Sequence, residues 1–151
     1  MMQSRRISLS LGAALLIAAM AVGCGRKPAD TGGTTGTTGT TAVKVAEITL
    51  GRGLGGDKSI SDATTTFRAN DTIYASVATE GAAPSATLRA RWTFEDGQTV
   101  DESSRTITPG NRERTEFHIS KPNGWPAGKY KVEVFLNDQS AGSKSFDVQA
   151  H

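Results

Sequence analysis

Apolar and polar residues alternate along much of the chain after residue 42, with the two-residue period that is typical of half-buried β-strands. The clearest example begins directly after a corner formed by two prolines and two glycines, at residues 121–128. Its core-facing positions are predicted to be Tyr130, Val132, Val134 and Leu136. Its outward positions are predicted to be Lys129, Lys131, Glu133 and Phe135.

Further strands follow at regular intervals and are separated by turn signals such as Asn70-Asp71, Asp96-Gly97 and Asn137-Asp138. The expected core positions are Ile73, Ala75, Val77, Leu88, Ala90, Trp92, Phe94, Thr115, Phe117, Ile119, Phe146 and Val148. Short strands are also expected at residues 99–100 and around Ile107. The alternation shifts phase within residues 43–50, which indicates a bulge or a switch between sheets in the first strand. Seven or so short strands predict an all-β, antiparallel sandwich over residues 43–151.

Two features of this pattern resemble the core of immunoglobulin-like and fibronectin III-like domains. Trp92 lies in the middle of its strand, and Gly128-Lys-Tyr130-Lys-Val132 resembles the tyrosine corner at the start of strand F. The resemblance implies that the Tyr130 hydroxyl bonds back to the preceding loop. Trp125, in the Pro/Gly loop before this strand, either caps one end of the core, which we favour, or stands exposed as a binding residue. Because this fold hosts many functions, the resemblance does not identify an activity.

The N-terminal residues are typical of a bacterial lipoprotein signal peptide at residues 1–23. Arg5 and Arg6 precede a short apolar run, and Ala21-Val22-Gly23-Cys24 resembles a lipobox, in which the cysteine sulfur receives a diacylglycerol. An uncleaved membrane helix would need about 20 predominantly apolar residues, and this run is shorter. We therefore expect Cys24 to be lipidated and to be the membrane attachment. Gly25, where an aspartate would act as an inner-membrane retention signal, favours the outer membrane and the periplasm.

Residues 24–42 are expected to form a flexible tether. Positions 31–41 contain only threonine and glycine, which offer no apolar surface to offset the entropy of ordering. A Gly-rich chain of about 18 residues has a typical end-to-end distance of roughly 24 Å. Such a spacer would hold the domain clear of lipid headgroups.

Charge and cysteine content exclude several classes of function. Of the 17 basic residues, two lie in the predicted signal peptide, so the remaining chain carries 15 basic beside 15 acidic residues. A neutral chain lacks the basic footprint of a nucleic-acid-binding protein. The single cysteine excludes an internal disulfide and leaves no set of thiolate ligands for zinc, so we expect no cofactor and no metal.

The chemistry of catalysis has few candidate residues here. His151 is terminal, and His118 is predicted to lie on the outward face of its strand. The acidic pairs at residues 95–96 and 101–102 flank a predicted hairpin and are interpreted as solvated turn charges. Residues 51–56 match the pattern G-x-G-x-x-G, but residues 57–66 have no apolar helical face and hence no helix to hold a pyrophosphate. The plain interpretation of Gly51–Thr66 is a mobile loop. We therefore expect no catalytic residues.

A surface patch is the remaining candidate site. If strands C and F are neighbours, Arg89, Arg91, Lys131 and Phe135 share one outer face. Phe135 could anchor a partner protein, surrounded by cations. Alternatively, it lies against the stems of arginines that pair with carboxylates, and this second interpretation is favoured because single apolar surface residues are common.

The sequence therefore predicts a lipid-anchored, non-catalytic module that binds or assembles an unknown envelope protein. The alternative is an accessory or inhibitor subunit that presents the Gly51–Thr66 loop to an envelope enzyme. A small hydrolase with an unrecognised site is the third and weakest interpretation.

Overall fold

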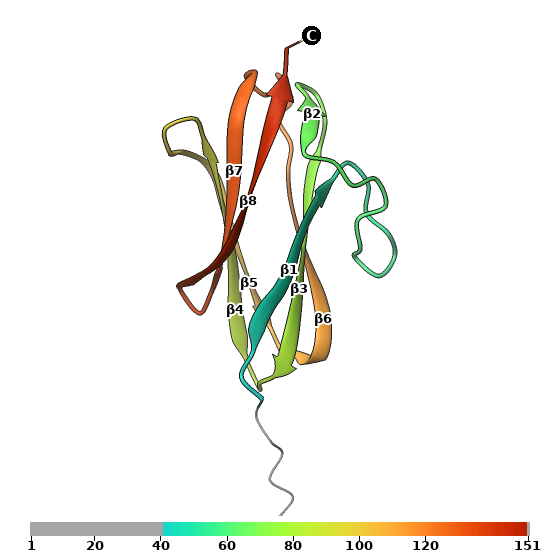
Figure 1. The fold of residues 1–151 in the computed structure, drawn as a ribbon, viewed down its shortest axis with the longest axis vertical. Helices are drawn as coiled ribbons and strands as arrows, with labels where there is room; N and C mark the ends of the chain where they lie inside the picture. The colour runs from blue at the N-terminus through green and yellow to red at the C-terminus, as the bar shows by residue number, and fades with distance from the viewer. Residues whose placement is uncertain (1–40, 151) are drawn as a thin grey trace, which may run out of the picture. The chain divides into compact units, whose positions relative to one another are not determined.

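The computed structural model describes residues 41–150, which form eight β-strands and no helix (Figure 1). The strands are β1 (Lys44–Gly51), β2 (Thr66–Arg68), β3 (Ile73–Ala82), β4 (Ala86–Phe94), β5 (Gln98–Ile107), β6 (Gly110–Ile119), β7 (Gly128–Leu136) and β8 (Gln139–Gln149). The predicted signal peptide, Cys24 and nearly all of the predicted tether lie outside the described residues. Among the described residues, no helix is long and apolar enough to cross a membrane.

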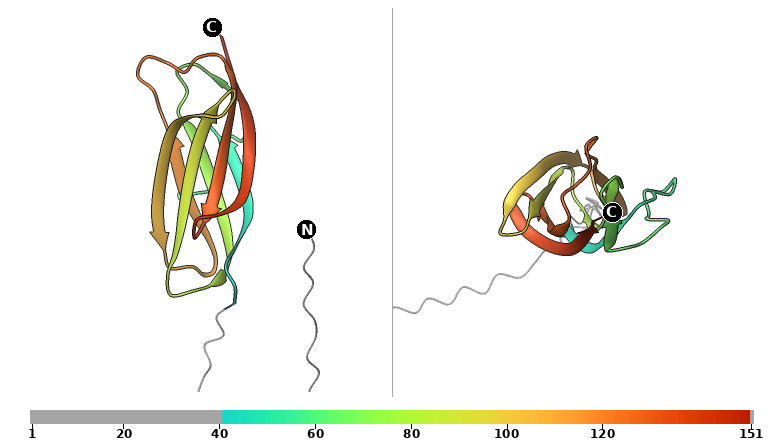
Figure 2. Two further views of the ribbon diagram at one scale, coloured as in Figure 1. Left: turned by 90° about the vertical axis from the view of Figure 1, so that its left-hand side faces the viewer. Right: turned by 90° about the horizontal axis from the view of Figure 1, so that it is seen from above.

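The strands form two sheets packed face to face (Figures 1 and 2). One sheet has the order β1-β3-β6, and the other has the order β2-β8-β7-β4-β5. All neighbouring strands are antiparallel except β2 and β8, which are parallel. The predicted all-β, immunoglobulin-like sandwich is thus confirmed, and the predicted strands that carry Trp92, Tyr130 and Phe146 are β4, β7 and β8 of one sheet.

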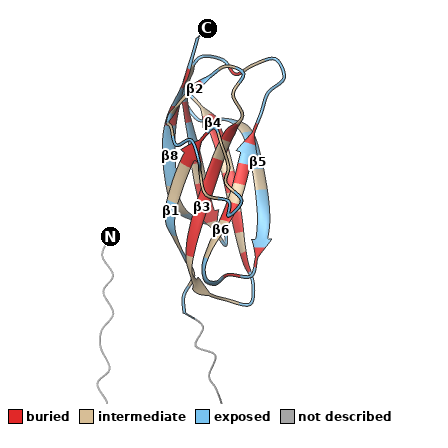
Figure 3. Cartoon of the chain, turned by 90° about the vertical axis from the view of Figure 1, so that its right-hand side faces the viewer, coloured by how far each residue is buried: buried red, intermediate tan, exposed pale blue. Residues whose placement is uncertain are grey.

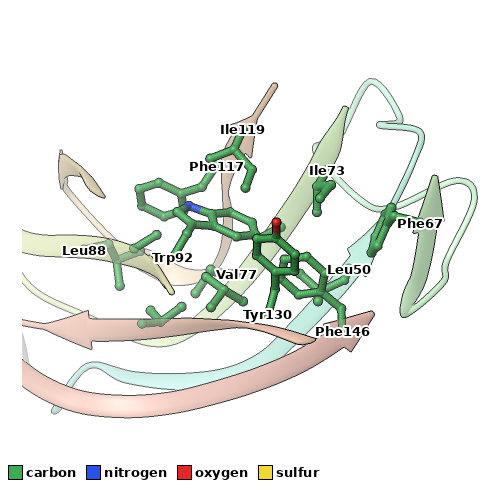
Figure 4. Packing of buried hydrophobic residues seen from close by; sticks show 14 of the residues in the cluster. Leu50, Phe67, Ile73, Val77, Leu88, Trp92, Phe117, Ile119, Tyr130 and Phe146 are labelled. Carbon is green, nitrogen blue, oxygen red and sulfur yellow. The ribbon is translucent and has the colours of Figure 1, made fainter. Parts of the chain in front are cut away.

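The core lies between the sheets and is built from the residues that the alternation assigned to it. Ile73, Val77, Leu88, Trp92 and Val132 are fully buried, because alternate positions of each strand point toward the opposite sheet (Figure 4). Trp92 pairs in register with Val132 on the neighbouring strand. Its ring meets Phe146 edge to face, at 5.9 Å between centroids. Burying each such side chain contributes about 1.5–3 kcal/mol to folding.

The tyrosine corner is present where the sequence predicted it. The Tyr130 hydroxyl donates a hydrogen bond of 2.8 Å to the carbonyl oxygen of Pro126, four residues upstream. The Tyr130 ring stacks on Phe146 at 5.3 Å and meets Trp125 edge to face at 6.1 Å. Trp125 is buried against the end of the core, so the interpretation of this residue as a cap is confirmed.

Two parts of the pattern were read incorrectly. Residues 99–100 and Ile107 do not lie on separate short strands, because residues 98–107 form the single strand β5. The chain also changes sheets between β1 and β2, and β2 was not predicted as a strand. The phase shift in the first strand is explained by a register shift between Val45 and Glu47. Both errors arise because polar edge strands lack the apolar alternation that identifies buried ones.

The two ends of the sandwich differ in what they carry. The described chain enters at Thr41, whose carbonyl oxygen accepts a 3.0 Å hydrogen bond from the Ala82 amide at the end of β3. Strand β4 runs from this end to Phe94 at the other, where Trp125 and the tyrosine corner lie (Figure 1). The aromatic cluster is therefore at the end of the domain opposite to its chain entry.

Candidate binding surfaces

The patch predicted from the sequence lies on the outer face of the five-stranded sheet. Strand β4 pairs with β7, so that Arg89 stands opposite Phe135 and Arg91 stands opposite Glu133. The guanidinium carbons of Arg89 and Arg91 lie 4.2 and 4.8 Å from the centroid of the Phe135 ring. As a result Phe135 is only 8% exposed, although it points away from the core. Cation–π contacts of this kind contribute about 0.5–1 kcal/mol each.

Carboxylates hold the two arginines in place over the ring. Arg91 donates to Glu133 at 2.9 Å, and Arg89 forms ion pairs of 3.3 Å with Glu102 and Asp138. Hydrogen bonds from Arg91 and then from Ser140 hold the pKa of Glu133 below its ordinary value. This arrangement matches the second interpretation of the patch, in which the Phe135 ring lies beneath the stems of arginines that pair with carboxylates.

The remaining patch residue, Lys131, is exposed and lies beside the others on β7. The structure therefore brings all four predicted residues onto one face. The arginines lie over the Phe135 ring, as the favoured interpretation of the sequence expected.

The Gly51–Thr66 segment leaves the sandwich and returns to it as two arms joined by hydrogen bonds. This ordered backbone differs from the mobile loop that the sequence suggested. Single β-bridges join Gly51 to Ala63 and Leu54 to Ile60, and further backbone bonds link the two arms (Figure 2). At the tip, the Asp57 carboxylate accepts bonds from the side chain and the amide of Ser59, which lower the pKa of Asp57. The short turn chemistry of these residues explains why no helix forms here.

The tip of this segment lies against the outer face of the three-stranded sheet. The Ser76 hydroxyl donates a 2.6 Å hydrogen bond to the carbonyl oxygen of Lys58. Ser76 is buried although it points away from the core, because the segment lies over it. A β-carbon at Gly51 would collide with the Asp62 carbonyl and with Ile60, so only glycine permits this close approach. No residue pattern in the sequence predicted this contact.

The base of the same segment is fixed to β2 and to the turn between β2 and β3. The Arg52 guanidinium donates to Asp71 at 2.8 Å and to the Thr66 carbonyl oxygen at 2.6 Å. Partial burial acts to raise the pKa of Asp71, but bonds from the Arg68 amide and from Arg52 bring it below its ordinary value. The segment is thus held at its base and at its tip.

The described residues offer few groups that could perform catalysis or hold a metal. His118 is exposed on β6, as predicted, where its ring contacts the Glu116 carboxylate and the Tyr74 ring. Within residues 41–150, no three histidine, cysteine, aspartate or glutamate side chains gather into a metal-binding group. His151 lies outside the described residues.

Comparisons with known proteins identify no family for this chain. No protein-family model and no curated protein matches the sequence. Solved structures of similar shape include an immunoglobulin-like protein from Pseudomonas aeruginosa, with 20% identity, a TM-score of 0.49, and coverage of 74% of this chain and 99% of that one. The CARDB domain of a Pyrococcus furiosus protein, in complex with di-metal ions, has 13% identity, a TM-score of 0.46, and coverage of 75% and 90%.

A third similar structure is the alkylpurine DNA glycosylase AlkC of Pseudomonas fluorescens bound to DNA containing an abasic site analog. It has 17% identity and a TM-score of 0.48, and the match covers 72% of this chain. The chain spans only 30% of the length of that glycosylase. At such low identity and TM-score, these likenesses carry no argument about function.

Proposed function

We propose that this protein is a lipid-anchored lipoprotein of the bacterial cell envelope, whose immunoglobulin-like domain binds another envelope protein without catalysing a reaction. The observation that carries the proposal is the lipobox-like Ala21-Val22-Gly23-Cys24, placed after a short apolar run and before the Thr/Gly tract that leads into β1. A diacylglycerol at Cys24 supplies two acyl chains, and each buried methylene contributes about 0.8 kcal/mol to membrane binding. The expected location is the periplasmic face of the outer membrane.

The geometry of the domain suits a tethered module. Its described chain enters at Thr41, at the end of the sandwich where β3 finishes. A lipid-anchored chain of this kind would turn its opposite end, and both sheet faces, toward proteins in the surrounding compartment. Tethering also raises the effective concentration of the domain near membrane-bound partners.

The first candidate for the surface that binds the partner is the outer face formed by Arg89, Arg91, Lys131 and Phe135. To serve as a buried anchor, Phe135 would have to be uncovered by rotation of Arg89 and Arg91, which are held by exposed or half-exposed ion pairs. Such pairs contribute about 1 kcal/mol or less each, so a partner that supplies its own carboxylates could recruit the two guanidinium groups.

One observation favours the alternative of an inhibitory or accessory subunit. The Gly51–Thr66 segment is held at both its base and its tip, by Arg52 to Asp71 and by Ser76 to Lys58. A segment fixed in this way loses little conformational entropy on binding, as an inhibitory element requires. In this case the segment, and not the Phe135 face, would contact an envelope enzyme.

Site-specific photo-cross-linking in the native envelope tests both candidates. A photoreactive residue in place of Lys131 reports on the Phe135 face, and one in place of Lys58 reports on the segment. We expect a defined cross-link from Lys131 that is lost in Phe135→Ser, with a fall in affinity of about 2 kcal/mol or more if Phe135 is a hot spot.

The matched control is Lys144→Ser, an exposed residue on β8 of the same sheet. A cross-link only from position 58 would favour the inhibitor alternative. Absence of any cross-link at either position, from protein that is correctly located and folded, would contradict binding by these surfaces.

A further inference from the structure

A cleft of about 470 Å³ opens between the two sheets at the end of the sandwich that carries the aromatic cluster. Phe94, Trp125 and Tyr130 contribute its apolar wall. Gln98 and Asp101 at the start of β5 form one rim, and Lys121 after β6 contributes to the other. The cleft therefore combines an aromatic interior with polar edges, as ligand sites commonly do.

The rim on the β5 side is the free edge of a sheet. Strand β5 is the last strand of the five-stranded sheet and pairs with β4 alone among the described strands, and Figure 3 shows it largely exposed. The second half of β5 is bridged to the other sheet, because Arg105 donates a 3.0 Å hydrogen bond to the Glu116 carbonyl oxygen on β6. Its first half has no such bridge and borders the cleft. A free edge of this kind can pair with an added strand.

An irregularity in β5 lies beside the cleft. Trp92 pairs with Asp101 and Thr93 pairs with Thr99, so Val100 has no direct partner on β4. Val100 instead packs partly buried against the core. Bulges of this kind re-aim side chains and are common next to functional sites.

Polar side chains on an edge strand also have a purely protective role, since they prevent edge-to-edge aggregation. That role accounts for Arg105, which covers the seam between the sheets. It does not account for an aromatic-lined opening left beside the same strand. Nor does it account for the indole nitrogen of Trp125, which is buried and has no hydrogen-bond partner within the described part of the chain. Trp125 as a whole is 7% exposed.

The charge around this edge is negative. Glu95 and Asp96 in the β4–β5 turn, and Asp101 and Glu102 on β5, lie within eight consecutive positions. Glu102 is paired with Arg89, whereas Asp96 and Asp101 have no ion-pair partner in residues 41–150. The edge is thus complementary to a positively charged segment.

We propose that the first half of β5 and the adjoining cleft form a docking site for an extended, basic segment of a partner protein. The segment adds to the free edge of β5 and places one apolar side chain against Phe94 and Trp125, with a lysine or arginine beside Asp101. Main-chain hydrogen bonds supply affinity and the cleft supplies specificity. The inference rests on the proposed function of a protein-binding module, and it names the kind of partner and a surface apart from the Phe135 face.

The test is a selection of random heptapeptides, displayed on phage, against the processed full-length lipoprotein in detergent. We expect enriched peptides with an apolar residue between lysines or arginines, and slower hydrogen exchange of β5 amides when such a peptide binds. Replacing the apolar residue of the peptide by serine should weaken binding about 30-fold.

Three variants locate the site. Asp101→Lys should slow association and weaken binding, with an effect that salt reduces, and Gln98→Trp should block the cleft. Glu47→Lys is the matched charge reversal, on an exposed position of β1 at the opposite side of the domain, and should have no effect. Thermal melts check that each variant folds.

Each outcome decides between distinct ideas. Failure to enrich any peptide, or equal binding by wild type, Asp101→Lys and Gln98→Trp, overturns the docking site. Peptides whose binding is lost in Phe135→Ser but is unchanged in Asp101→Lys and Gln98→Trp would leave the binding module standing and exclude this site. Self-association abolished by Asp101→Lys would mean that a second copy of the chain occupies the edge, and it too would contradict the proposal.

Discussion

Replacing Tyr130 by phenylalanine isolates the interaction that fixes the corner before β7. The substitution keeps the ring, which packs between Phe146 at 5.3 Å and Phe94 at 4.7 Å, and it removes only the hydroxyl group. That hydroxyl donates the 2.8 Å bond to the Pro126 carbonyl oxygen. Any loss of stability therefore reports on one hydrogen bond and on the loop that it holds.

The expected loss follows from the burial of the donor. Tyr130 is 3% exposed, so its hydroxyl group lies away from solvent and water cannot easily take its place. A typical intramolecular hydrogen bond contributes about 0.5–1.5 kcal/mol, and a buried group left unpaired costs about 1–3 kcal/mol. Pro126 is exposed, which allows water to reach its carbonyl and limits the loss to about 1–2 kcal/mol. For a domain of this size, the midpoint of thermal unfolding should fall by roughly 5–10 °C.

The pH dependence gives a second signature of the same residue. Burial, and then the negative charge of Glu95, raise the pKa of Tyr130 above its ordinary value of 10.0. The neutral phenol is favoured in the folded state, so its contribution is complete below about pH 10 and is lost as the pH rises toward the folded pKa. Tyr130→Phe should remove this alkaline loss.

Urea unfolding at pH 7 and at a series of alkaline pH values measures both effects. Lys129→Ala, an exposed neighbour, is the control for a change on the same strand. Equal stability of Tyr130→Phe and wild type at pH 7 would refute the role assigned to the corner bond.

Three other substitutions test separate parts of the structure. Trp92→Ala removes a fully buried ring, and urea melts should show a loss of about 3–5 kcal/mol; a smaller loss than Tyr130→Phe would contradict its central place in the core. Gly51→Ala should speed hydrogen exchange in residues 54–63 because its β-carbon meets Asp62 and Ile60, and unchanged exchange would count against that packing. Glu133→Gln should flatten the acid side of the stability profile. The lowered pKa of Glu133 makes its contribution complete above about pH 4.5 and lost as the pH falls through the folded pKa, so an unchanged profile would argue against the Arg91 pair.

The alternation of apolar residues was sufficient to predict the sandwich because most strands are half buried. Trp92, Val132 and Phe117 occupy core positions that the two-residue period alone assigns. The corner at Tyr130 was predictable as well, from the resemblance of Gly128-Lys-Tyr130-Lys-Val132 to the tyrosine corner of immunoglobulin-like domains.

The features that the sequence did not reveal depend on contacts between distant segments. Burial of Ser76 requires the Gly51–Thr66 segment to fold back, and the sequence shows only turn residues there. The polar edge strand β5 gave no alternation, so neither its full length nor the cleft beside it could be predicted.

Mass spectrometry of the intact processed protein, purified from the native envelope, tests the lipid anchor of the proposed module most directly. We expect the mature chain to begin at Cys24 and to carry a diacylglyceryl group on its sulfur, and Cys24→Ser to be unlabelled and released from the membrane or left unprocessed. A processed wild-type chain with an unmodified Cys24, or one that begins at another residue, would contradict the account.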